Sequence, residues 1–158
     1  MLERQDAVFL VGEDVSWDDA SAYAQWAGRQ LPTEAQWERA ARGGLDGQQY
    51  RWGDGFDAAK CANNKTSTEP VGSYPPNGFG LYDMAGNVWQ WCRDWYDKDW
   101  YAAMPGVNLE NTTQGKYRVK RGGSWGSGAR DLRGASRDNG RPDLRRDLNI
   151  GFRCVEAH

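Results

Sequence analysis

The feature that most constrains the fold is an aromatic-rich segment punctuated by turn-forming residues. From Leu45 to Gly86 the residues Gly, Pro, Asn and Asp recur, as is typical of loops rather than of helices or strands. Aromatic residues are nevertheless dense from Trp52 to Trp100, whereas disordered segments are poor in them. Because such rings bury large areas when they pack, the segment is predicted to be a long, ordered loop region attached to a core.

Two helices are predicted before this segment. Ser16 and Thr33 are each followed three residues later by a side chain that can complete a capping box, and Gly28 and Gly43-Gly44 supply stops. Apolar residues recur at helical spacing in both intervals. We therefore expect one helix over residues 16–27 and a second from Thr33 to the glycine pair.

Short strands are predicted elsewhere. Residues 7–11 form an apolar run of the length of a buried strand, and residues 117–120, 132–137 and 151–155 resemble short strands with alternating polarity. The first of these strands is expected to pair with the last, which would bring the two ends of the chain together.

The bulk composition excludes several classes of function. A length of 158 residues predicts one domain, and a net charge of -2 with a pI near 5.4 provides no overall attraction to nucleic acid or anionic membranes. No apolar run approaches the roughly 20 residues of a membrane span, and residues 1–6 lack the pattern of a secretion signal. We expect a soluble protein, cytoplasmic or phage-associated, with no nucleic-acid or membrane partner.

The cysteines and the histidine limit the chemistry further. Cys61, Cys92 and Cys154 are too few and too widely spaced for a zinc ribbon or a disulfide scaffold, so buried free thiols are predicted. A direct bond between Cys92 and Cys154 stays open as an alternative. The single histidine is His158, the last residue, which excludes a histidine-based triad or general base.

A stretch near the C-terminus uses a restricted set of amino acids. Between the motifs Arg121-Gly-Gly-Ser-Trp125 and Ile150-Gly-Phe-Arg-Cys154, residues 126–149 contain only Gly, Ser, Ala, Arg, Asp, Leu, Asn and Pro, although aromatics supply 13% of the chain. The two motifs resemble structural strands, and the interior resembles a surface that presents side chains. A loop-rich connection between strands favours several of these amino acids in any case.

Several motifs together resemble the formylglycine-generating enzyme (sulfatase-modifying factor) family, in the right order from Ser16 to Val155. The resemblance implies an α+β, C-type-lectin-like fold with two helices, a small twisted antiparallel sheet and many loops. Typical members begin with a further segment, so we expect one shortened domain over residues 1–158. The motifs are Arg29-Gln-Leu-Pro-Thr-Glu-Ala-Gln-Trp-Glu38, Ala40-Ala-Arg-Gly-Gly44, Tyr50-Arg-Trp-Gly53, Pro76-Asn-Gly-Phe-Gly-Leu-Tyr82, Ala85-Gly-Asn-Val-Trp-Gln-Trp91, Asp94-Trp-Tyr96 and the two C-terminal motifs.

The catalytic chemistry of the family does not carry over. Its oxidase members bind copper through two cysteines shortly after the Arg-Gly-Gly-Ser motif, and residues 126–149 contain no cysteine. Ala24, Ala41 and Gly134 stand where the family has disulfide cysteines, which favours free thiols. The chain is therefore predicted to be non-catalytic and to require no cofactor.

The resemblance also implies a calcium site. The ligands would be the side chains of Asp83 and Gln90 and the carbonyls of Gly86 and Val88, and these oxygens suit calcium. Gln90 replaces a carboxylate, so affinity should be weakened. The alternative is that Asp83 and Gln90 close a loop by hydrogen bonds.

The restricted stretch resembles the variable region of proteins diversified by retroelements, here residues 121–154. Adenine mutagenesis converts AAC-type codons into codons of the form NNC, which cannot encode Lys, Glu, Gln, Met or Trp. All five are absent from residues 126–149, and Asn139 and Asn149 would be unmutated template positions.

The resulting prediction is a display protein that binds a protein or another macromolecule. The alternatives are a formylglycine-generating oxidase or another enzyme of the family, an undiversified module, and a calcium-dependent lectin, for which no Glu-Pro-Asn type motif is present. Arg133, Arg137 and Arg153 are assigned to the framework. The candidate ligand-binding residues are Gly126, Ser127, Gly128, Arg130, Asp131, Ser136, Asp138, Asn139, Arg141, Leu144, Arg146 and Asp147.

Overall fold

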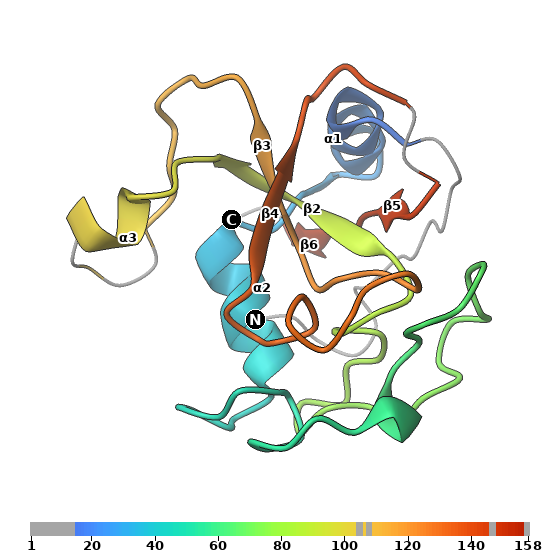
Figure 1. The fold of residues 1–158 in the computed structure, drawn as a ribbon. Helices are drawn as coiled ribbons and strands as arrows, with labels where there is room; N and C mark the ends of the chain where they lie inside the picture. Colours follow the sequence, from blue (N-terminus) through green and yellow to red (C-terminus); the bar gives the residue numbers. More distant parts are fainter. Residues whose placement is uncertain (1–14, 104–105, 107–108, 146–147, 157–158) are drawn as a thin grey trace.

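The structure is a computed structural model that describes residues 15–103, 106, 109–145 and 148–156. A small mixed sheet lies at its centre, with one helix on each face (Figure 1). The helices are α1 (Trp17–Trp26), α2 (Glu34–Arg42), the 3-10 turn η1 (Ala58–Lys60) and the short α3 (Trp100–Ala103). The strands are β1 (Arg29–Gln30), β2 (Trp89–Trp95), β3 (Arg118–Arg121), β4 (Arg137–Gly140), β5 (Ile150–Gly151) and β6 (Val155–Glu156).

The helix predictions are confirmed, including their caps. Ser16 caps α1 through a capping box with Asp19, and Thr33 caps α2 through a capping box with Gln36. The α2 helix ends at Gly43 in the left-handed conformation, with φ of 58°, where a side chain would be strained. Local hydrogen bonding by short polar side chains therefore fixes where both helices begin.

The main sheet has the order β4-β3-β2-β5, and a separate two-stranded sheet joins β1 and β6. The pairs β2-β3 and β3-β4 are antiparallel, whereas the short β5 lies parallel to β2. The predicted α+β, C-type-lectin-like fold class is confirmed, with β5 as the parallel exception to an otherwise antiparallel sheet. Strand β4 forms one edge.

The two faces of β2 belong to two different cores. Trp89 and Trp91 pack with Ala20 and Ala24 of α1, while Cys92 packs in a second cluster with residues of α2. Because side chains alternate across a strand, β2 joins the two helices through opposite faces of the sheet. Figure 1 shows α1 and α2 on either side of the strands.

The long loop between α2 and β2 is ordered by a third core, as predicted. Tyr50, Cys61, Ala85 and Leu132 are buried together, and the ring of Trp52 stacks on Tyr50 with centroids 5.4 Å apart. Leu132 comes from the restricted stretch, so this stretch rests directly on the long loop.

Two strand predictions need correction. Residues 132–136 form turns instead of a strand, because Leu132 is the buried anchor of a loop, and the strand starts only at Arg137. Residues 151–155 contain two pieces, β5 and β6, rather than one strand. The final strand β6 pairs with β1, and the predicted strand over residues 7–11 lies outside the described residues.

The three cysteines are free and buried, as predicted. Cys92 and Cys154 belong to different cores, so the open alternative of a bond between them is wrong. Within the described ranges, no helix is long and apolar enough to cross a membrane.

Candidate functional site

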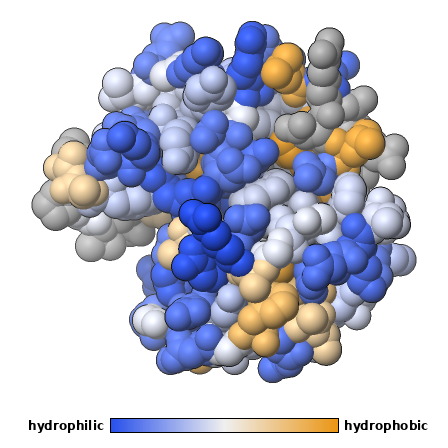
Figure 2. Space-filling view, viewed as in Figure 1, coloured by the Kyte–Doolittle hydropathy of each residue, from blue (hydrophilic) through white to orange (hydrophobic). Residues whose placement is uncertain are grey.

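The candidate binding residues lie along one edge of the molecule and not in a single cleft. We call residues 126–145 the β4 face, because a loop enters β4 at one end and a second loop leaves it at the other (Figure 1). Figure 2 shows a mostly hydrophilic surface over β4, with hydrophobic patches toward the upper right and below the centre.

The loop before β4 carries exposed side chains, and hydrogen bonds to its backbone carbonyls and amides hold it in place. Gly126, Gly128, Arg130 and Asp131 are exposed, whereas Ser136 is half-buried and its hydroxyl donates to the Arg130 carbonyl at 2.5 Å. The same loop is fixed at two further points. The Tyr50 hydroxyl donates to the Ala129 carbonyl at 3.2 Å, and the Gly134 amide donates to the Gln49 carbonyl at 2.8 Å.

The other end of the β4 face lies against the start of α1. The Asp18 amide donates to the Pro142 carbonyl at 3.2 Å, and Arg145 forms an ion pair with Asp19. The loop between these contacts carries the exposed Leu144.

Charged pairs occupy the middle and the far end of the β4 face. Asp138, half-buried on β4, lies 3.2 Å from the Lys120 ammonium, and Asn139 is also half-buried. The exposed Arg141 and Asp143 form a pair at 2.9 Å. The Arg141–Asp143 pair is exposed and therefore contributes little stability, whereas Lys120 in the other pair is nearly buried.

Two predicted positions do not fit the β4 face as expected. Ser127 is only 7% exposed, because its hydroxyl turns inward and accepts a hydrogen bond from the Ser124 amide at 2.9 Å. Ser127 is therefore a framework residue. Arg133, assigned to the framework, is exposed, although its Nε does donate to the Arg130 carbonyl at 2.9 Å. The predicted positions Arg146 and Asp147 lie outside the described residues.

A buried charge network connects β3 and β4 to α2. Arg121, 0% exposed, donates to Glu34 and to Glu38, each at 2.6 Å, and to the Gly134 carbonyl at 2.7 Å. Burial disfavours the Arg121 charge, but Glu34 and Glu38 outweigh burial and raise its pKa. Arg137 completes the network through Nε and Nη2, at 2.6 and 2.8 Å from the Glu34 carboxylate.

Framework roles predicted for two arginines are confirmed by their contacts. The Arg137 guanidinium lies 5.0 Å from the ring centroids of Tyr96 and Tyr101. Arg153 is fully buried and donates to the Tyr82 carbonyl at 3.0 Å. Both side chains therefore hold loops and strands together instead of facing a ligand.

Two residues of the expected calcium site, Asp83 and Gln90, are joined by a hydrogen bond. The Gln90 amide oxygen accepts from Trp37 Nε1 at 2.8 Å and from Arg153 Nε at 2.7 Å, while its Nε2 donates to the Asp83 carbonyl at 2.7 Å. The Asp83 carboxylate accepts from the Gly72 amide at 2.8 Å. Because the Gln90 oxygen faces a guanidinium, this donor set does not fit a calcium ion, and the arrangement supports the alternative of a closed loop.

Calcium removal is accordingly expected to leave the thermal midpoint unchanged, within about 1 °C, because a ligand that does not bind the native state cannot shift its stability. Thermal unfolding is to be followed in excess calcium and in excess EDTA. Gln90→Leu, which leaves the buried Trp37 and Arg153 donors without their acceptor, should lower the midpoint equally in both conditions. A midpoint that rises with calcium would contradict the expectation.

Comparison with known proteins identifies the family of this chain. A family model described as "Sulfatase-modifying factor enzyme 1-like domain" matches residues 12–158. The chain belongs to the sulfatase-modifying factor family. Residues 121–154, with both motifs that border the restricted stretch, lie inside the matched range, so the β4 face is part of the family domain.

The relatives that match this chain include one described as an enzyme and one described as inactive. The formylglycine-generating enzyme of Streptomyces coelicolor is 45% identical over 160 residues, covering 89% of this chain and 51% of that protein. The inactive C-alpha-formylglycine-generating enzyme 2 of Mus musculus is 39% identical over 162 residues, covering 90% and 48%. The chain spans about half the length of these relatives, and membership of the family does not decide whether it is an enzyme.

A variable protein has a similar structure. Treponema denticola variable protein 1 matches with a TM-score of 0.70 at 34% identity, covering 82% of this chain and 48% of that one. This protein belongs to the class that the restricted stretch resembles. The likeness confirms that the chain shares its fold with variable proteins as well as with enzymes of the family.

The buried charge network was the main feature that sequence reasoning missed. Glu34 and Arg121 are 87 residues apart, and only their positions inside two family motifs marked them. In the part of the chain that the structure describes, no three or more His, Cys, Asp or Glu side chains group so that they could hold a metal ion.

Proposed function

We propose that this chain is a non-catalytic binding module that uses the β4 face to bind a protein or another macromolecule. The observation that carries the proposal is the contrast between the two sides of this face. Arg130, Asp131 and Arg141 are exposed, while the segment between them is fixed at two points: Arg121 donates to the Gly134 carbonyl, and the Arg137 side chain binds Glu34 of α2.

This contrast is what a variable binding surface requires. Exposed side chains can change without disturbing the core, and a backbone that is already ordered reduces the entropy lost on binding. Arginine offers a planar set of donors and an apolar stem, which favours it at protein interfaces. Leu144, 44% exposed, adds apolar area that a partner would cover.

Diversification by a retroelement is the second part of the proposal. The absence of Lys, Glu, Gln, Met and Trp from residues 126–149 is what codons of the form NNC would produce, and the likeness to a variable protein supports the same origin. The gene tests this directly. Codons at the exposed positions should end in C, and a nearly identical AAC-rich repeat should lie beside a reverse transcriptase gene.

The lack of accessible thiols supports a non-catalytic role. Copper oxidation of a cysteine substrate needs thiolate ligands near the surface, and residues 126–149 contain none. Burial raises the pKa of Cys61, Cys92 and Cys154, which disfavours the thiolate form that binds metals.

Binding capacity can be measured with two displayed libraries of the full chain, each with NNC codons at four exposed positions and each selected against the same unrelated target proteins. The test library varies Arg130, Asp131, Arg141 and Leu144. The control library varies Lys98, Asp99, Ala102 and Ala103, around α3. Specific binders are expected from the test library at a clearly higher frequency, and equal frequencies would refute the proposal.

Oxidase activity is the alternative that the identity to a formylglycine-generating enzyme favours. The full chain is to be loaded with Cu(I) and supplied with oxygen and a cysteine-containing peptide. We expect no oxygen consumption above that of copper and peptide alone. Copper-dependent turnover that needs the protein would establish an enzyme and overturn the non-catalytic proposal.

A further inference from the structure

A pocket of about 340 Å³ lies between α1 and β1. Volumes of this order are typical of sites for small organic ligands. None of the lining residues belongs to the candidate binding residues described above. The pocket is lined by Trp17, Ser21, Ala24 and Gln25 of α1, by Arg29, Gln30 and Leu31 of β1 and the residue after it, and by Arg93 of β2.

One wall of the pocket is a fixed aromatic ring. Trp17 Nε1 donates to the Cys92 carbonyl at 2.8 Å, and the Arg118 guanidinium stacks on the Trp17 ring, 3.7 Å from its centroid. Arg118 is held in turn by Trp95, whose ring centroid lies 3.6 Å away on the other side. The Trp17 ring therefore cannot rotate freely and lines the pocket in a fixed position, with Arg118 stacked on one of its faces.

The opposite wall is a hydrogen-bonded polar group. Arg93 donates to Glu110 through Nε at 2.8 Å and Nη2 at 2.6 Å, and its Nη1 bonds the side-chain oxygen of Gln30. Gln30 Nε2 donates to the Glu156 carbonyl at 3.2 Å. The Arg93 charge is thus matched by the Glu110 carboxylate, so this wall is polar but carries little net charge.

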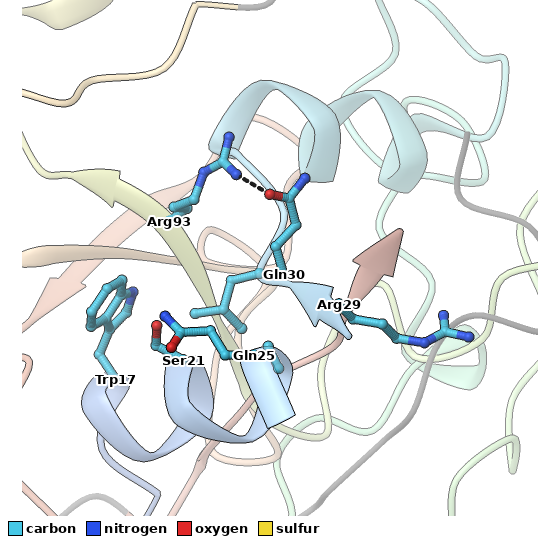
Figure 3. Close-up of a pocket in the computed structure, with 8 residues that line it drawn as sticks. Trp17, Ser21, Gln25, Arg29, Gln30 and Arg93 are labelled. Carbon is cyan, nitrogen blue, oxygen red and sulfur yellow. Dashed lines mark hydrogen bonds between the residues drawn. The ribbon is translucent and has the colours of Figure 1, made fainter. Parts of the chain in front are cut away.

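Two polar side chains remain available on α1. Ser21 and Gln25 have no side-chain hydrogen-bond partner among the described residues, and Figure 3 shows both beside Trp17, across the cavity from Gln30 and Arg93. In the same view the Arg29 side chain extends away from the other labelled residues. Hydroxyl and amide groups both donate and accept hydrogen bonds.

We propose that this pocket binds a neutral saccharide unit without calcium. A pyranose ring matches the lining in three respects: its hydroxyls donate and accept like Ser21 and Gln25, its C–H face is flat like the Trp17 ring, and it carries no charge. The floor, Ala24 and Leu31, is buried and apolar, which suits the less polar face of the sugar. The proposal stands independently of the protein-binding role of the β4 face.

Saturation-transfer NMR on the full chain tests the pocket, with the methyl glycosides of glucose, galactose, mannose and N-acetylglucosamine as probes. At least one probe should bind with a dissociation constant of about 1 mM, a value typical of a single weakly held small ligand. Excess EDTA should not change the signal. A loss on chelation would point to a calcium site instead and would overturn the proposal.

Two variants locate the binding. Gln25→Ala removes an exposed amide and should weaken binding about tenfold, the loss of roughly one good hydrogen bond. Ser21→Trp fills the cavity and should abolish the signal. Gln49→Ala, an exposed glutamine outside the pocket, is the matched control and should bind normally.

Circular dichroism and thermal midpoints must first show that each variant is folded; if Ser21→Trp is not, the Gln25→Ala comparison decides. Binding of no probe at tens of millimolar, or equal binding by Gln25→Ala and Gln49→Ala, would refute the proposal.

Discussion

Replacing Arg121 by alanine is expected to destabilise the domain by about 3–5 kcal/mol, because the variant loses a fully buried cation shared by two carboxylates. Glu34 then keeps only Arg137, and Glu38 keeps only Arg42, as a charged partner. Glu34 is only 1% exposed and Glu38 is partly buried, and each loses a charge-assisted hydrogen bond of 2.6 Å. The Gly134 carbonyl loses its donor as well. For a domain of this size the thermal midpoint should fall by roughly 10 °C.

Arg42→Ala is the matched control for this variant. Arg42 also pairs with Glu38 at 2.6 Å, but this pair is partly exposed to solvent, so its loss should cost at most about 1 kcal/mol. Urea unfolding at pH 7 measures both variants against the parent chain. If Arg121→Ala costs no more than Arg42→Ala, the network does not hold β3 to α2.

Helix boundaries were predictable because they depend on neighbours in sequence. Ser16 and Thr33 accept from backbone amides three residues later, and Gly43 ends α2 with a positive φ. A strand such as β2 gives no comparable signal. Trp89 and Cys92 are buried in different cores on opposite faces, so polarity does not alternate along the strand.

Composition predicted which stretch of the chain forms the candidate face, but it did not predict which residues of that stretch are buried and which are exposed. Ser127 and Arg130 come from the same restricted stretch, and only tertiary structure turns the Ser127 hydroxyl toward the Ser124 amide. In the same way Leu132 anchors a loop because Tyr50 and Cys61 lie beneath it, across a large sequence separation. Sequence pattern alone carries no information on such contacts.

The separation of the buried charge network from the β4 face allows one fold to carry different sets of surface residues. Arg121 and Glu34 hold the strands from inside, independently of which side chains project from residues 128–131. Catalytic residues or varied binding residues can therefore occupy the same surface without loss of the core. In the present chain residues 126–149 contain no cysteine, and the proposed binding role rests on this feature.

Gly123→Ala is expected to cost about 3 kcal/mol and to displace the loop that enters the β4 face. Gly123 has φ of 72°, a conformation that costs other residues about 1–2 kcal/mol. An added Cβ would also lie 2.7 Å from Leu132 Cδ2 and 3.2 Å from the Asp131 carbonyl, so the loop must shift. Any ligand selected on the parent surface should then bind more weakly.

Gly126→Ala, three residues further along, is the control. It shows whether the loss is specific to Gly123 or follows from any glycine-to-alanine substitution in this loop. A Cβ at Gly126 meets nothing within 4 Å, and its φ is not positive, so stability and binding should stay within about 0.5 kcal/mol of the parent values. Urea unfolding gives the two free energies, and titration with a selected ligand gives the two affinities. Equal values for both variants would show that the backbone conformation at Gly123 does not set the position of the loop. A loss confined to Gly123→Ala would show that the backbone conformation inside the Arg-Gly-Gly-Ser motif places the binding side chains.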